Sequence, residues 1–107
     1  MPTARYDFGV AALGGKIYAA GGSNDNTPLS TVEAYNPQTN TWAVVAPMST
    51  PRKSFGLAAV RGKLYAVGGV DGSTKLATAE AYNPQTDRWE AVAPMSGKRH
   101  GLALAVM

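Results

Sequence analysis

The chain has 107 residues, of which 45% are hydrophobic and 16% charged, and its net charge is +3. This length allows one small domain, and a glycine-rich chain with few charges and several aromatic residues is not typical of disorder. The lack of cysteine and the single histidine disfavour disulfides, thiolate chemistry, metal centres and serine–histidine–aspartate triads.

Membrane and nucleic-acid partners are not expected. The sequence holds no apolar run of the roughly 20 residues that span a bilayer. It also holds no basic run longer than two residues, whereas a nucleic-acid-binding surface favours clustered cations. The first residues lack the apolar core of a signal peptide, so we expect a soluble protein and leave its compartment open.

An internal repeat with a period of 47 residues organises the chain. When residues 1–60 are paired with residues 48–107, 32 of the 60 pairs are identical. The seven residues that begin at Glu33 recur unchanged from Glu80. The expected units are two full copies and the start of a third, over residues 1–47, 48–94 and 95–107.

Each full unit is expected to form four short strands joined by turns. In the second unit the strands are predicted over residues 55–60, 63–67, 78–82 and 88–93. Arg61-Gly62 is typical of a two-residue hairpin turn, and the residues after Asn83 are typical of a proline-containing turn. A polar loop is predicted over residues 70–75. No window combines a helical period with caps, so each unit is expected to be an antiparallel meander.

One four-stranded sheet cannot bury both of its faces. Trp42 and Trp89 are large apolar side chains that recur at the same position of the repeat, and they are expected to be mostly buried against a neighbouring sheet. Repetition of such sheets around an axis gives a β-propeller, which typically has about 4–8 blades. The sequence therefore predicts an all-β fold of two propeller blades plus one extra strand.

The sequence resembles kelch-repeat proteins, whose period is near 50 residues. The resemblance rests on the double glycine that ends the second strand, the tyrosine followed seven residues later by tryptophan, and the arginine beyond an Ala-Pro-Met-Ser stretch. It covers almost the whole chain. It implies that the first strand of each blade lies at the propeller axis and the fourth at the rim, and that a complete propeller commonly has six blades.

Two blades do not make a propeller. We therefore expect the chain to be part of a longer propeller or to close a ring with copies of itself, and a homotrimer would give six blades. Each chain would then carry a surplus copy of the first strand. Either one end frays, or the C-terminal copy displaces the first strand of the next chain, and the sequence does not choose between these.

A recurring arginine and a recurring glutamate have two interpretations. Glu33 and Glu80 stand in otherwise apolar strands, and a buried carboxylate needs a partner. The arginines could pair with them and hold strands or blades together, or they could face a ligand. The three arginines are Arg5, Arg52 and Arg99.

The net charge is expected on one face of the propeller. The loops between blades and the loops after the double glycines share that face and carry six cations and three acids, while the other eight charges cancel. In kelch adaptor proteins this face takes peptides, often acidic ones, so the resemblance implies an acidic peptide or protein as partner. The candidate ligand-binding residues are Arg5, Asp7, Asn24, Asp25, Arg52, Lys53, Ser54, Asp71, Lys75, Arg99 and His100.

The loops at Asn24–Asp25 and at Asp71 contain fragments of calcium-loop composition. Neither has the spacing or the final glutamate of an EF-hand, so turns are expected there, with no metal and no cofactor.

Two classes of function remain open. The first is a non-catalytic kelch propeller that binds protein or serves as a scaffold. The second is an enzyme of the same fold. Galactose oxidase-type relatives need a cysteine-linked tyrosine and paired histidines, which this chain lacks, whereas a sugar-isomerising propeller remains an alternative because its polar site could lie in other blades. The near-identity of the loops in the two copies favours the first class, without catalytic residues.

Overall fold

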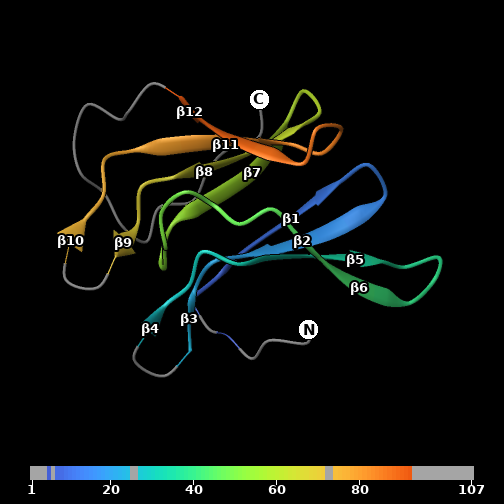
Figure 1. Ribbon diagram of the computed structural model, residues 1–107, viewed down its shortest axis with the longest axis horizontal. Coiled ribbons are helices and arrows are strands. Elements are labelled where there is room, and N and C mark those ends of the chain that lie inside the picture. The colour runs from blue at the N-terminus through green and yellow to red at the C-terminus, as the bar shows by residue number, and fades with distance from the viewer. Residues whose placement is uncertain (1–4, 6, 25–26, 72–73, 93–107) are drawn as a thin grey trace.

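The computed structural model describes residues 5, 7–24, 27–71 and 74–92, and the regular structure in these residues is β-strand. Two four-stranded antiparallel sheets form, each a meander whose four strands lie side by side in chain order (Figure 1). This confirms the all-β fold of two blades, and the extra strand expected within residues 95–107 lies outside the described residues. No helix in this part of the chain is long and apolar enough to cross a membrane.

The two sheets have the same construction, and we call them blade 1 and blade 2. The strands of blade 1, in spatial order, are β1 (Gly9–Leu13), β2 (Lys16–Ala20), β5 (Val32–Asn36) and β6 (Thr41–Val45). The strands of blade 2 are β7 (Gly56–Val60), β8 (Lys63–Val67), β11 (Ala79–Asn83) and β12 (Arg88–Val92). The expected strands of blade 2 therefore hold to within a residue at each end.

The expected polar loop after each double glycine is a short hairpin instead. The hairpins pair β3 (Ser23–Asn24) with β4 (Thr27–Pro28), and β9 (Val70–Asp71) with β10 (Thr74–Lys75). A backbone hydrogen bond closes the base of each one, from Leu29 N to Gly22 O at 2.8 Å and from Leu76 N to Gly69 O at 2.9 Å. Both hairpins lie at the same end of the molecule (Figure 1).

The tight turns depend on left-handed backbone. Val60 pairs with Lys63 across the turn, and the two residues between them, Arg61 and Gly62, have φ values of 50° and 79°. Two successive residues with positive φ are the requirement of the type I′ hairpin turn, whose twist matches that of the strands. The expected two-residue turn is confirmed.

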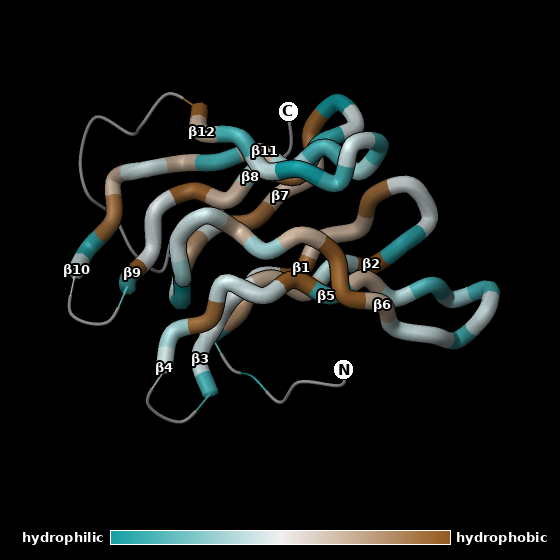
Figure 2. Tube along the Cα trace, in the orientation of Figure 1, coloured by the Kyte–Doolittle hydropathy of each residue, from teal (hydrophilic) through white to brown (hydrophobic). Residues whose placement is uncertain are grey.

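The blades share one hydrophobic core. Strands β1 and β7, the first of each blade, lie side by side, and a Cβ added at Gly9 would come within 2.7 Å of the Leu57 Cβ. Only glycine lets the two inner strands approach this closely. Hydrophobic residues concentrate on the strands and hydrophilic ones at the turns (Figure 2). The core side chains, from both blades, are Tyr18, Ala20, Val32, Ala34, Met48, Phe55, Leu64, Ala66 and Tyr82.

The tryptophans are less buried than expected. Trp42 and Trp89 are half-buried because they lie on the outermost strand of each blade. The central aromatic contact is made by Tyr18 and Tyr82 instead, whose ring centroids lie 5.8 Å apart across the two blades. Each tryptophan packs on the tyrosine of the neighbouring strand, with ring centroids 5.1 Å apart.

Candidate functional site

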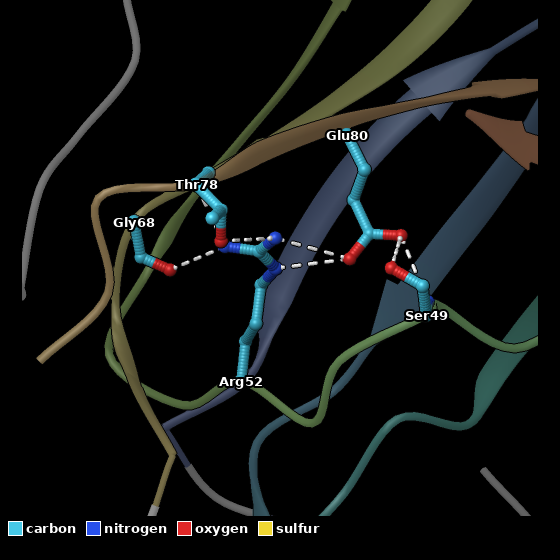
Figure 3. Close-up of polar contacts among 5 residues, drawn as sticks. All are labelled: Ser49, Arg52, Gly68, Thr78 and Glu80. Carbon is cyan, nitrogen blue, oxygen red and sulfur yellow. Dashed lines mark hydrogen bonds and ion pairs between the residues drawn. The ribbon is translucent and has the colours of Figure 1, made fainter. Parts of the chain in front are cut away.

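The side chain of Arg52 binds three residues of blade 2. Its Nη1 donates to the carbonyl oxygens of Gly68 and Thr78, both at 2.9 Å, and its Nη2 donates to the Thr78 hydroxyl at 3.1 Å. Its Nε and Nη2 donate to Glu80 Oε2 at 3.2 and 3.1 Å (Figure 3). The other oxygen of Glu80 accepts from the backbone N–H and the hydroxyl of Ser49. We call Ser49, Arg52, Thr78 and Glu80 the blade-2 clamp.

The backbone of Arg52 binds blade 1. Its N–H donates to Leu29 O at 3.1 Å, and its carbonyl oxygen accepts from Gly22 N at 2.6 Å. One residue on the connection between the blades is therefore bound to blade 1 through its main chain and to blade 2 through its side chain. This arrangement fixes the position of one blade relative to the other.

The double glycines make room for this connection. Gly21 has a φ of 63°, and a Cβ there would lie 2.5 Å from the Arg52 carbonyl oxygen. Gly69 has a φ of 92°, and a Cβ there would lie 2.7 Å from Lys53 O. Both positions need glycine for its backbone conformation and for the close approach of another chain segment.

Blade 1 carries the same clamp, with fewer hydrogen bonds among the described residues. Arg5 donates to the carbonyls of Gly21 and Thr31, to the Thr31 hydroxyl, and to Glu33 Oε1 at 2.7 Å. Arg5 Nε and Glu33 Oε2 are buried, and no hydrogen-bond partner for either is found among the described residues. Of the two interpretations of these arginines, the geometry of Arg5 and Arg52 is that of buried ion pairs.

A second contact joins the blades at the rim. Trp89 Nε1 donates to Ala46 O at 2.8 Å, and the Ala46 N–H donates to Asp87 Oδ1 at 2.9 Å. The same oxygen of Asp87 accepts from the Tyr82 hydroxyl at 2.8 Å. Both backbone groups of Ala46 are thus bound by blade 2. We call this contact the rim latch.

The rim latch shifts the protonation of its members. The hydrogen bond from the Ala46 backbone, followed by that from Tyr82, lowers the pKa of Asp87 below its ordinary value of 3.8. Burial, together with the hydrogen bond to the Asp87 carboxylate, raises the pKa of Tyr82.

Beside the latch, a pocket of about 290 Å³ lies between the blades. Its lining residues are Leu13, Gly14, Lys16, Tyr18, Val45, Tyr82, Pro84 and Asp87.

The other candidate ligand-binding residues gather on the face that carries the two hairpins. Ser54 N donates to Asp7 O at 2.9 Å, and Lys53 forms a backbone bridge with Val70, next to Asp71. We define the loop face by its described polar residues, all exposed or half-buried: Asp7, Asn24, Lys53, Ser54, Asp71 and Lys75. The candidates Asp25, Arg99 and His100 lie outside the described residues.

The sequence analysis did not identify several clamp and latch residues. Ser49, Thr31 and Thr78 bind the buried ion pairs, and Asp87 binds the rim. The sequence did indicate the hydroxyl residues by their recurrence, since Thr31 recurs as Thr78 and Ser49 as Ser96 at the repeat spacing.

In the described part of the chain, no group of three or more His, Cys, Asp or Glu side chains is placed to hold a metal ion.

Two antiparallel meanders of one repeating sequence, packed side by side with their first strands adjacent, define a pair of β-propeller blades. The Kelch motif matches residues 4–49 and 51–96. The chain therefore belongs to the Kelch-motif family, as the resemblance implied.

Relatives match over about one blade. The chain is 51% identical over 51 residues to the Homo sapiens influenza virus NS1A-binding protein, covering 48% of this chain and 8% of that protein. It is 46% identical over 46 residues to Rattus norvegicus Kelch-like protein 36, covering 43% and 8%. It is 43% identical over 47 residues to Homo sapiens Kelch repeat and BTB domain-containing protein 13, covering 44% and 10%. The chain thus spans at most a tenth of the length of these relatives.

Neutralising the glutamate should have unequal effects in the two clamps. In Glu80→Gln the amide nitrogen replaces an oxygen that accepts two hydrogen bonds, and Arg52 loses its countercharge in a buried site. We expect a loss of about 3 kcal/mol in the free energy of unfolding, the lower end for a broken buried pair. In Glu33→Gln the amide nitrogen can take the place of Oε2, which accepts no hydrogen bond from the described residues, so the loss should be clearly smaller. Urea denaturation of both variants measures this, and equal losses would contradict the account.

The rim latch should weaken in acid. Because the pKa of Asp87 is lower in the folded chain, its contribution to stability is fully present above the unfolded value of 3.8. That contribution is lost as the pH falls through the folded pKa. Asp87→Asn keeps the acceptor oxygen, as Asn40 does in blade 1, but does not titrate. Thermal unfolding between pH 7 and pH 2 should therefore show a flatter acid limb for this variant, and identical acid limbs would rule out the contribution.

Proposed function

We propose that this chain is a non-catalytic, protein-binding kelch module whose blades complete a closed propeller with the blades of identical chains, six blades from three chains being favoured. The observation that supports ring closure is a difference in burial between equivalent positions. Leu64 in blade 2 is fully buried, whereas Ile17, at the same position of blade 1, is 40% exposed. The face that blade 2 buries against blade 1 is thus open to solvent on blade 1.

The opposite ends of the two-blade unit are complementary. Blade 1 also exposes Val10, and its Tyr18 is buried, while the equivalent Tyr65 of blade 2 is half-buried. An exposed apolar sheet face of this kind is typical of an interaction surface. The contact between blades 1 and 2 within one chain is the template for the contact proposed between chains, because the two blades are similar in sequence. Contacts repeated head to tail in this way close into rings when the rotation permits.

The solution mass tests ring closure. We expect about 33 kDa by light scattering, three times the chain mass of 11.1 kDa. Ile17→Glu should dissociate the ring because it places a charge on the proposed interface, and it should leave each chain folded because Ile17 is already exposed. The matched control is Ala43→Glu, which introduces the residue that blade 2 carries at the equivalent Glu90. A mass of one chain at all concentrations would disprove ring closure.

The surface that we propose for protein binding is the loop face. One relative is named for binding influenza virus NS1A, which supports protein binding as a use of such blades. Arg5 and Arg52 are each paired with a glutamate. Among the described residues, Lys53 and Lys75 are therefore the cations that would attract an acidic segment. Asp7 and Asp71 would repel the same segment. The positions of the ligand's charges, as well as its net charge, would therefore decide whether it binds.

Charge reversal tests this surface. Lys53→Glu with Lys75→Glu should weaken binding of a labelled peptide of alternating glutamate and serine at least tenfold at low salt. The matched control reverses Lys16 and Lys63, which lie at the turns of the β1–β2 and β7–β8 hairpins. Fluorescence anisotropy compares the variants. Equal affinity for both double variants would remove the loop face as the binding surface.

A further inference from the structure

The pocket beside the rim latch lies at the opposite end of the molecule from the loop face, and we call it the turn pocket. It is lined by residues of the β1–β2 turn and the β11–β12 turn, whereas the two short hairpins of the loop face stand at the other end (Figure 1). Its volume of about 290 Å³ is small for a drug-sized ligand and suits one long side chain. Both of its walls belong to one chain, so the turn pocket does not depend on ring closure.

The blade-2 wall of the turn pocket carries a carboxylate with an oxygen available to a ligand. Asp87 accepts both of its latch hydrogen bonds with Oδ1, from Ala46 N and from the Tyr82 hydroxyl. Among the described residues, Oδ2 accepts no hydrogen bond, and the ion pairs there are made by Glu33 and Glu80 instead. The two latch donors are uncharged, so they orient the carboxylate without neutralising it.

Two tyrosine rings line the turn pocket beside this carboxylate. Tyr18 and Tyr82 have ring centroids 5.8 Å apart and an angle of 58° between their ring planes. Burial and, after it, the charge of Asp87 raise the pKa of Tyr18, so the Tyr18 hydroxyl and the carboxylate lie in one electrostatic environment. A cation that enters the pocket would be attracted both by Asp87 and by the faces of the rings.

The repeat shows that the negative charge is particular to this position. Asp87 corresponds to Asn40 in the other repeat, and Gly14 corresponds to Arg61. Each of these two differences makes the turn pocket more negative by one charge than the equivalent residues of the other repeat would. Gly14 also leaves the edge of the pocket open, since a Cβ added there would meet no atom within 4 Å.

Arginine is the side chain that matches these groups best. Its planar guanidinium group has five donors and stacks on aromatic rings, while its aliphatic stem packs on apolar surface. The turn pocket provides a carboxylate oxygen, two tyrosine rings and the apolar side chains of Leu13, Val45 and Pro84. Lysine is a more strongly hydrated point charge, so it gains less from the rings.

We propose that the turn pocket binds an arginine side chain of a partner protein. The guanidinium group donates to Asp87 Oδ2 and lies against the ring of Tyr18, and the stem contacts Leu13 and Pro84. Lys16, which is exposed on the blade-1 wall, opposes the charge of the ligand. The inference rests on the proposed protein-binding function and adds a second surface, which prefers a basic segment where the loop face prefers an acidic one.

Peptides that differ in one side chain test the proposal on the full chain. The probe is a blocked peptide of glycine and serine with one central arginine, and the control peptide carries citrulline, which has nearly the same shape and no charge. In a titration followed by ¹H–¹⁵N NMR, the arginine peptide should shift the amides of Gly14, Lys16 and Asp87. The citrulline peptide should bind about fivefold more weakly, the range of an exposed ion pair.

Three variants test the roles of the charges. Asp87→Asn keeps the Oδ1 acceptor of the rim latch and should lower the affinity for the arginine peptide about fivefold. Lys16→Gln removes the opposing cation and should raise the affinity about twofold. Gly14→Arg copies Arg61, whose φ of 50° shows that this turn position accepts a side chain, and should weaken binding more than the uncharged control Gly14→Gln.

The outcomes separate this inference from the proposed function. Equal affinity for the arginine and citrulline peptides would overturn it, as would wild-type affinity in Asp87→Asn. Tighter binding of a leucine peptide would also overturn it, because the turn pocket would then be an apolar anchor site.

The double variant Lys53→Glu with Lys75→Glu should bind the arginine peptide as the wild-type chain does at about 0.15 M salt, where charges at the far end are screened. If the wild-type chain binds the acidic peptide but not the arginine peptide, this inference fails and the loop face stands. If it binds neither peptide, both fail.

Discussion

The arrangement of the two blades depends on Arg52, a buried arginine bound on both sides. Its main chain is hydrogen-bonded to blade 1, and its guanidinium group binds two carbonyls, a hydroxyl and a carboxylate of blade 2. A buried charge is strongly destabilising unless its donors are satisfied. Because the groups that satisfy Arg52 come from separate segments, the charge fixes where those segments lie. Hydrophobic packing alone would allow sheets rich in small residues to slide, since it is not directional.

The need for satisfied hydrogen bonds in the clamp also means that the contact between neighbouring blades can recur from one repeat to the next. Glu80, Asp87 and Trp89 receive the connection that leaves blade 1, and blade 1 has Glu33, Asn40 and Trp42 at the same positions. Two differences remain: Asn40 stands where Asp87 does, and in the connecting segment Pro2 stands where Ser49 does. A repeat protein is stabilised by contacts between neighbouring units, so a segment with the right donors can make the same contact with any unit. In the proposed function, this is the physical basis for assembly from identical chains.

Much of the fold could be predicted from the sequence, and the clamp only in part. The 47-residue repeat, the double glycines and the hairpin turn at Arg61-Gly62 specify two four-stranded meanders, because these features act locally. Pairing of the recurrent arginines and glutamates was foreseeable as one of two interpretations. The hydrogen bonds of Arg52 O to Gly22 and of Trp89 to Ala46 were not, because they depend on the angle between blades. The tryptophans were expected to be mostly buried because of their large apolar side chains, but they are half-buried because they lie on the outermost strand of each blade.

Amide hydrogen exchange tests the central claim most directly. The backbone N–H groups of Ser49 and Arg52 lie on the connection between blades, outside the regular strands, and donate to Glu80 and to Leu29. If the clamp holds the blades together until blade 2 itself unfolds, these two amides should exchange as slowly as that of Ala81, which is paired within blade 2 in the middle of β11. Exchange of Ser49 and Arg52 at the rate of an unstructured peptide, with Ala81 still protected, would contradict the account.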